Sequence, residues 1–329
     1  MNHLFPEHIV NLSLPPDQRW AFLNEYKEAI NDLLLCYLND FDGADFIFDN
    51  IELFKNAIIS EEYLQEIDFI ASISNFSSNE VLIANLYYDI LKFYFGCTAF
   101  AVSNSQSVLH ARNLDWHTEN NLLGKHTQIF NFQQDGKTLF KTVGWPGFVG
   151  TLSGVSPGKF SLTLNAVLSG DLPEIATPVS FLLRDILTSS NTFQEARDIL
   201  ENAKIASDCL ILLSGIAADE KNVIERTPTR FATRASECDY IIVTNDYKKI
   251  QSFTSENSSI LQTTSCGRFE RTESLLKKAI PGHLEECMQI LRDEGVKMNI
   301  TVQQMVFDNK TGDIYISADG KEITNRNVT

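Results

Sequence analysis

One cysteine lies where a long helical region of this sequence gives way to strands, and ionisable side chains follow it closely. Cys97 opens a run of strand-forming residues, and Arg112 and Asp115 lie at the end of the next run. The polar residues 104–107 separate the two runs, which is typical of a β-hairpin. A hairpin would return Arg112 and Asp115 to the side of Cys97.

This arrangement favours a cysteine nucleophile. A guanidinium beside a thiol lowers the thiol pKa and enriches the reactive thiolate, while a carboxylate can hold an ammonium or orient a base. The alternative for Cys97 is a small buried apolar residue, the usual fate of a lone cysteine. The alternative for Arg112 and Asp115 is a surface ion pair at a strand end.

Other residue types give weaker signals. His110, His117 and His126 suggest a metal site or a papain-like cysteine–histidine pair, but their spacing fits no helix-borne ligand motif. Four glycines between 144 and 154 precede no Lys-Ser/Thr pair, so they form no phosphate loop. We therefore expect neither a metal nor a cofactor.

The composition restricts the class of protein. The chain has 329 residues, of which 43% are hydrophobic and 21% are charged, an ordinary globular composition. Its net charge of −16 disfavours nucleic acid as a partner and purely electrostatic docking on anionic lipid. Six scattered cysteines without a C-x-x-C pair argue against a disulfide lattice.

The beginning of the sequence bears on location. It has neither a basic region nor an apolar stretch, so the sequence as written predicts no signal peptide and a cytoplasmic protein. No stretch approaches the roughly 18 consecutive apolar residues of a membrane span.

The elements that must position Cys97 fall into two groups. Residues 17–95 show apolar positions at helical spacing in three stretches, which begin at Asp17, Ser60 and Ser78. From Cys97 onwards strands dominate, and Asp135-Gly136 is a strong hairpin-turn signal. The expected strands are 97–103, 108–113, 127–133, 137–143, 148–152, 160–165, 209–214, 221–225 and 239–244, with a last hairpin turning at 310–312.

Helices interrupt the strands at two places. The expected helices are 176–188, 192–203, 268–279 and 282–293. Strands, then helices, then strands, then helices predict two antiparallel sheets covered by helices, a layered α+β domain.

The blocks around Cys97 resemble the acid ceramidase and N-acylethanolamine acid amidase family. Residues 97–102 and 110–115 are similar to that family's C-T-S-I-V-A and H-G-R-N-x-D blocks, at the same separation. The similarity continues through 145–165, and residues 11–20 resemble the start of the family's smaller subunit. The resemblance therefore runs over nearly the whole chain.

This resemblance implies membership of the N-terminal-nucleophile hydrolases, which include bile salt hydrolases and penicillin V acylases. It implies an αββα four-layer sandwich at 97–329, preceded by a helical N-terminal segment at 1–96. It also implies self-cleavage of the Gly96–Cys97 bond, after which the N-terminal fragment becomes the smaller subunit. Cys97 would then attack an amide carbonyl, with its own α-amine as the base.

Further site residues follow from the resemblance alone. Arg112 and Asp115 match the residues that position the thiol and the amine. Asn245 matches the asparagine that donates from its side-chain amide to the oxyanion, and Asn165 aligns with another asparagine on the oxyanion side. Read alone, an asparagine at a strand end is more often a turn residue.

Two further positions near the site are compared with the family, of which one matches and one differs. Arg268 resembles the second active-site arginine, with Arg271 as the competing assignment, and either alone would be a surface charge at a helix start. Ala166 stands where the ceramidases have a glutamate, as in the bile salt hydrolases. Because this glutamate is missing, the resemblance leaves the acidic pH optimum and the exact lipid substrate open for this chain.

The implied function is hydrolysis of fatty N-acyl amides, of the ceramide or N-acylethanolamine type, to a fatty acid and an amine. The alternatives are a bile-salt-hydrolase-like or penicillin-acylase-like amidase, and a non-catalytic lipid-binding protein on the same fold. The expected partners are a lipid-like N-acyl amide, the chain's own N-terminal fragment and, transiently, a membrane surface. Close family members are lysosomal, so the resemblance implies a lysosomal or secreted location.

Overall fold

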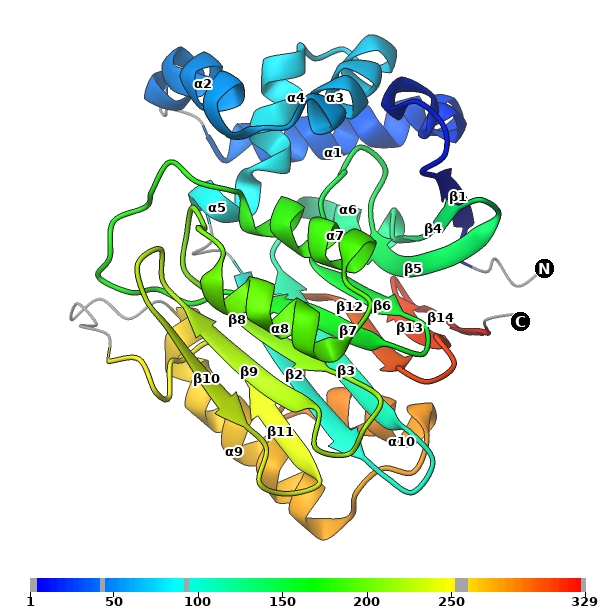
Figure 1. Ribbon diagram of the computed structural model, residues 1–329, viewed down its shortest axis with the longest axis vertical. Coiled ribbons are helices and arrows are strands. Elements are labelled where there is room, and N and C mark those ends of the chain that lie inside the picture. The colour runs from blue at the N-terminus through cyan, green and yellow to red at the C-terminus, as the bar shows by residue number, and fades with distance from the viewer. Residues whose placement is uncertain (1–4, 42–44, 92–94, 252–259, 327–329) are drawn as a thin grey trace.

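The computed structural model describes residues 5–41, 45–91, 95–251 and 260–326, and within these ranges the strands form two sheets, of eight and six strands (Figure 1). The eight-stranded sheet has the order β1 (Glu7–Asn11), β4 (Gln128–Gln134), β5 (Lys137–Gly144), β6 (Ser153–Ser156), β7 (Phe160–Asn165), β8 (Cys209–Ser214), β9 (Lys221–Arg226) and β10 (Phe231–Ala235). The six-stranded sheet has the order β11 (Tyr240–Val243), β2 (Phe95–Ser103), β3 (Val108–Trp116), β12 (Thr301–Asp308), β13 (Ile314–Ala318) and β14 (Lys321–Asn325).

Helices cover the outer face of each sheet. Helices α7 (Val179–Ser189) and α8 (Phe193–Asn202) pack on the eight-stranded sheet, and α9 (Ile260–Lys278) and α10 (Leu284–Leu291) pack on the six-stranded sheet. Every residue of β3, β7, β8 and β9 is buried, because each of these strands has a neighbouring layer on both faces. The αββα sandwich predicted from the sequence is confirmed.

The N-terminal segment lies against one end of the sandwich (Figure 1). Its helices are α1 (Lys27–Asn39), α2 (Asp45–Ile58), α3 (Glu61–Ile73), α4 (Ser78–Asn85) and α5 (Tyr87–Leu91), preceded by two 3₁₀ turns at Pro16–Gln18 and Ala21–Tyr26. A further 3₁₀ turn at Glu119–Asn121 leads into the short helix α6 (Leu122–Lys125). Apolar residues of these helices and of the eight-stranded sheet form one continuous core. No helix in the described ranges is long and apolar enough to cross a membrane.

The sequence-based predictions differ from the structure in one expected strand and in several elements that were not expected. A strand expected at 148–152 is wrong, because the backbone there bonds to helices: Val149 N donates to Asn85 Oδ1 at 2.8 Å, and Thr151 N donates to Ser180 O at 2.9 Å. Strand β6 begins only at Ser153. Strands β1, β10 and β14 and helix α2 were not expected.

Strand β1 also corrects the expectation of purely antiparallel sheets. It pairs in parallel with β4, with Glu7 opposite Ile129 and Asn11 opposite Gln133. The N-terminal segment therefore contributes an edge strand to the eight-stranded sheet. The division of the chain at 96/97 stays a prediction, and residues 92–94, at the end of the predicted helical region, lie outside the described residues.

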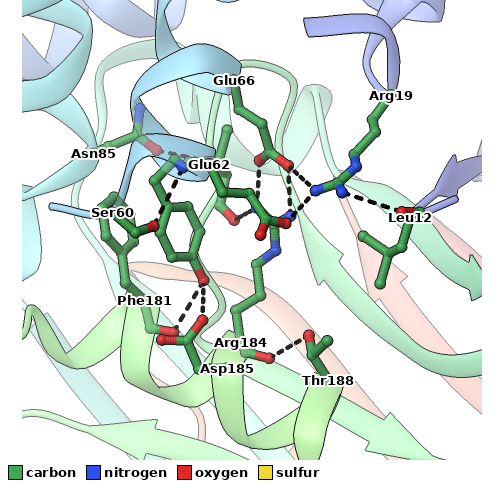
Figure 2. A network of polar contacts seen from close by, with 12 residues as sticks. Leu12, Arg19, Ser60, Glu62, Glu66, Asn85, Phe181, Arg184, Asp185 and Thr188 are labelled. Atoms are coloured by element: carbon green, nitrogen blue, oxygen red, sulfur yellow. Dashed lines mark hydrogen bonds and ion pairs between the residues drawn. The ribbon is translucent and has the colours of Figure 1, made fainter. Parts of the chain in front are cut away.

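A buried ion pair joins the N-terminal segment to the sandwich (Figure 2). Glu66 of α3 accepts two hydrogen bonds from Arg184 of α7, at 2.5 and 2.7 Å, and is also 3.2 Å from Arg19. The Arg184 guanidinium lies 4.9 Å from the ring centroid of Tyr63 and 5.0 Å from that of Phe132. Burial alone would lower the pKa of Arg184, but the Glu66 carboxylate raises that pKa above its usual value.

We predict that Glu66→Ala destabilises the fold by about 3–5 kcal/mol, because it leaves the Arg184 charge buried without its carboxylate. Glu62 is the matched control, since it pairs with the same Arg19 but its side chain is 53% exposed. Glu62→Ala should cost at most about 1 kcal/mol. Urea unfolding of both variants measures the difference, and equal losses would contradict the assigned role of Glu66.

Candidate active site

The side-chain alternation of β2 points Cys97 into the layer between the two sheets. Phe100 and Val102 belong to the core under α9 and α10, whereas Ala99 and Ala101 belong to the core between the sheets. Because strand residues alternate with a period of two, Cys97 shares the inner face with the two alanines. Cys97 Sγ accordingly lies 3.7 Å from Leu164 O of the eight-stranded sheet.

Arg112 reaches the thiol from the neighbouring strand, as the predicted hairpin requires. Its Nη2 donates to Cys97 Sγ at 3.2 Å, and its Nη1 donates to Leu152 O at 2.8 Å. The same guanidinium also bonds to Ser153 Oγ and Leu164 O in the eight-stranded sheet. The Arg112 side chain is fully buried, and a cation next to a thiol stabilises the nucleophilic thiolate.

Asn245 and Arg268 hold the backbone of Cys97. The amide N of Cys97 donates to Asn245 Oδ1 at 3.1 Å. Arg268 of α9 donates to Cys97 O at 2.5 Å and to Asn245 Oδ1 at 2.7 Å. Burial lowers the pKa of Arg268, while Asp115 and Cys97 oppose that shift.

The structure distinguishes between the two candidate arginines. Arg268 is 4% exposed and contacts Cys97, whereas Arg271 forms a surface ion pair with Asp293 at 2.6 Å. Only Arg268 is therefore placed to act at Cys97.

Asp115 lies opposite Gly96 in the pairing of β2 with β3. Its Oδ1 accepts a hydrogen bond from Thr301 Oγ1 at 2.5 Å, and its buried Oδ2 has no hydrogen-bond partner among the described residues. Burial raises the pKa of Asp115, and the nearby Arg268 and the hydrogen bond from Thr301 oppose that shift. A buried carboxylate oxygen without a hydrogen-bond partner among the described residues therefore belongs to the residue that pairs with Gly96, the neighbour of Cys97 in the chain.

The two predicted asparagines differ in their contacts. Asn245 Nδ2 donates to Ala166 O at 2.7 Å. Asn165 ends β7 as expected, but its Nδ2 donates to Thr244 O at 2.9 Å and to Val243 O at 3.3 Å. Asn165 therefore ties the end of β7 to the end of β11, since both of these hydrogen bonds go to backbone carbonyls there.

The three candidate histidines lie at separate places in the fold. His110 lies between the sheets, where it contacts Ser161 at 2.8 Å, Ser214 at 2.9 Å and Thr163 at 2.8 Å. Burial, helped by the charge of Arg112, lowers the pKa of His110 to about 3, so this histidine is neutral. His117 and His126 line two separate hollows beside the N-terminal segment. Across the described residues, no three His, Cys, Asp or Glu side chains are grouped as metal ligands.

Sequence reasoning missed three partners of the site. Thr301 carries no motif and lies 186 residues from Asp115. The other two are backbone carbonyls, of Leu152 and Leu164, whose roles depend on the packing of one sheet on the other rather than on side-chain type. The chain runs without a break from Phe95 through Gly96 into Cys97 as one strand, and the Cys97 side chain is fully buried.

We predict that Cys97 resists alkylation in the uncut chain, because its thiol is buried in the main core. Cys238 and Cys266 are exposed and serve as internal positive controls. Brief treatment with iodoacetamide, followed by peptide mass mapping of the full-length band, should label these two and leave Cys97 unmodified. Rapid labelling of Cys97 in the full-length band would contradict its burial.

A comparison with protein families matches residues 102–319 to the family described as acyl-coenzyme A:6-aminopenicillanic acid acyl-transferase. Among individual proteins, acid ceramidase of Balaenoptera acutorostrata scammoni is 30% identical over 252 residues, and that of Homo sapiens is 28% identical over the same length. Each comparison covers 67% of this chain and 63% of the relative, so the chain spans a little under two thirds of these relatives.

Two solved structures share the fold. A Caenorhabditis elegans N-acylethanolamine-hydrolyzing acid amidase ortholog matches with a TM-score of 0.55 and 24% identity, over 65% of this chain and 93% of that chain. The conjugated bile acid hydrolase of Clostridium perfringens, as a mutant, matches with a TM-score of 0.51 and 15% identity, over 69% and 92%. These similarities agree with the sandwich described above.

Proposed function

The chain belongs to the acyl-coenzyme A:6-aminopenicillanic acid acyl-transferase family, within the N-terminal-nucleophile hydrolases, and we propose that it is an amide hydrolase with Cys97 as its nucleophile. The single observation that carries this proposal is the contact of Arg112 Nη2 with Cys97 Sγ, at 3.2 Å in a fully buried site. That contact gives one of six cysteines the environment of a reactive thiolate.

The first step is cleavage of the chain itself. The thiol of Cys97 attacks the carbonyl carbon of Gly96, the peptide C–N bond breaks, the thiol proton passes to the departing nitrogen, and the acyl group of residues 1–96 moves to sulfur. Water then hydrolyses this thioester, which frees the thiol and the α-amine of Cys97. The hydrogen bond from Cys97 N to Asn245 Oδ1 supports this step, because that nitrogen belongs to the peptide group that must react. Arg268 holds Cys97 O, the carbonyl oxygen of the following peptide group.

The second step is amide hydrolysis. The new α-amine takes the thiol proton, the thiolate attacks the substrate carbonyl, and the proton passes to the departing amine. Water then releases the acyl group from sulfur. Asn245 Nδ2 carries two N–H groups, of which Ala166 O uses one, so the second is available to the oxyanion.

The substrate class that we propose is the fatty N-acyl amides, of the ceramide or N-acylethanolamine type. The names of the acid ceramidase and N-acylethanolamine-hydrolyzing relatives support it. Cys97 also belongs to the largest apolar core of the molecule, and burial of each CH₂ of an acyl chain contributes about 0.8 kcal/mol. Ala166, in place of the ceramidase glutamate, favours a bile-salt-hydrolase-like or penicillin-acylase-like amidase as the second candidate.

We also propose that the N-terminal fragment stays bound after cleavage as the second subunit. The parallel pairing of β1 with β4 and the Glu66–Arg184 ion pair support this association. All six cysteines are free thiols, so the association would be non-covalent. The resemblance to lysosomal enzymes supports a lysosomal or secreted location.

The parent chain should cut itself before Cys97, which divides the 37.1 kDa chain into fragments of about 11 and 26 kDa. Cys97→Ala should remain whole, because it lacks the attacking thiol. Cys209→Ala, which removes another fully buried thiol, should cut normally. Intact-mass measurement of all three proteins, with N-terminal sequencing of the larger fragment, decides the point, and a new N-terminus elsewhere would remove Cys97 from the role.

Asn245→Ala should lower kcat by about a hundredfold or more and change KM little, because its second N–H is needed only where negative charge develops. Steady-state kinetics of the cut protein against a panel of fatty N-acyl amides, conjugated bile acids and penicillin V measures this effect and identifies the substrate class. Arg271→Ala is the control, since that side chain pairs with Asp293 at the surface. A kcat within about threefold of the parent would exclude Asn245 from the oxyanion role.

A further inference from the structure

A hydroxyl group on β12, the strand paired with β3, holds the carboxylate beside the proposed cleavage point. Thr301, the first residue of β12, donates from Oγ1 to Asp115 Oδ1 at 2.5 Å. The backbone N of Met298 donates to the same Oγ1 at 3.0 Å. Because that oxygen accepts from Met298, its single proton is directed at Asp115.

The backbone of β12 is shaped to present this hydroxyl. Thr301 pairs with Asp115 and Gln303 pairs with Leu114, so two residues on β12 advance the pairing by one residue on β3. This irregularity is a β-bulge, a device that re-aims side chains next to active sites. Trp116 N donates to Ile300 O at 3.0 Å, and Thr301 N donates to Met298 O at 3.2 Å. These two hydrogen bonds hold the turn that precedes β12.

The hydroxyl uses one carboxylate oxygen and leaves the other available. Asp115 Oδ2 is buried without a hydrogen-bond partner in the part of the chain that the structure describes. Asp115 lies opposite Gly96, whose bond to Cys97 yields an α-amine on cleavage. An unsatisfied buried carboxylate oxygen is costly, and an ammonium formed there would satisfy it.

Four titratable groups lie around this carboxylate on different elements. Arg268 of α9, Arg112 of β3 and Lys297 of the turn after α10 act on it electrostatically, and all three favour the ionised form. Cys97, on β2, is the neighbouring thiol that also interacts with Arg268. Burial opposes ionisation, so the hydrogen bond from Thr301 is one of the interactions that keep the pKa of Asp115 from rising further.

We propose that Thr301 is a positioning residue of the active site: it orients and stabilises the Asp115 carboxylate so that Oδ2 receives the α-amine of Cys97. This inference rests on the proposed function for its catalytic meaning. Thr301 does not touch the reacting atoms, and it acts only through Asp115.

The experiment compares Thr301→Val, which keeps the shape and removes the hydroxyl, with Thr301→Ser, which keeps the hydroxyl. The readout is kcat/KM of the cut proteins from pH 4 to 8, on the amide that the parent hydrolyses best. Loss of a hydrogen bond to a charged group should raise the pKa of Asp115 by about one unit. Activity requires the carboxylate, so the acidic limb of the Thr301→Val profile should move to higher pH by about one unit, with Thr301→Ser unshifted.

A second measurement does not depend on activity. The ¹³C carboxyl resonance of Asp115 in the uncut Cys97→Ala chain should titrate at higher pH when Thr301→Val is added and remain in place with Thr301→Ser. Should Thr301→Val not fold, Thr301→Ala carries the same test. Identical pH profiles and identical Asp115 titrations for the Val and Ser variants would overturn the proposal. A parent that hydrolyses no amide, together with a shifted Asp115 titration, would overturn the proposed function while supporting the contact.

Discussion

The buried guanidinium of Arg112 is the interaction on which the rest of the site depends. It extends from β3 of one sheet and donates to Leu152 O, just before β6, and to Ser153 and Leu164 O of the other sheet. A buried charge must find such partners, and these exist only when the two sheets pack in this one arrangement. The same group contacts Cys97 Sγ, so the packing of the sandwich and the environment of the thiol cannot vary independently.

The polar groups around Cys97 are already assembled in the continuous chain. Arg112 contacts its sulfur, Arg268 its carbonyl oxygen and Asn245 its amide nitrogen. Each of these partners is itself buried and held by a second contact, such as that of Asn245 Nδ2 with Ala166 O. Cleavage of the Gly96–Cys97 bond would therefore act on a preorganised site, and what changes is access to the thiol rather than the arrangement around it.

How far the sequence predicts this site depends on the distance over which each contact is made. The hairpin that joins Cys97 to Arg112 and Asp115 is local, so alternation and a polar turn were enough to predict it. Asn245 and Arg268 come from elements more than 140 residues away, and only the resemblance to a family identified them. Thr301 has neither a motif nor a local signal, because its role arises from a bulge in a strand pairing.

The errors in the predicted fold have the same origin. The apolar run at 148–152 has the composition of a strand, but its backbone bonds to Asn85 and Ser180 on two helices. Strand β1 is only five residues long and has a parallel partner more than 110 residues away, so nothing local marks it. Glu66 is a charged helix residue of the type that is usually exposed to solvent. Only the tertiary fold brings Arg184 to it.

The pairing of β1 with β4 also affects how the protein assembles and whether it can refold after it has unfolded. In the continuous chain, closing this contact has a modest entropic cost, because the connecting residues keep the two strands near each other. A cut before Cys97 would remove that tether, and any later separation of the pieces would make their reunion dependent on concentration. The assembled form would then be reached easily only once, by folding before the cut. Its lifetime would be set by the rate at which it unfolds, rather than by an equilibrium to which it can return.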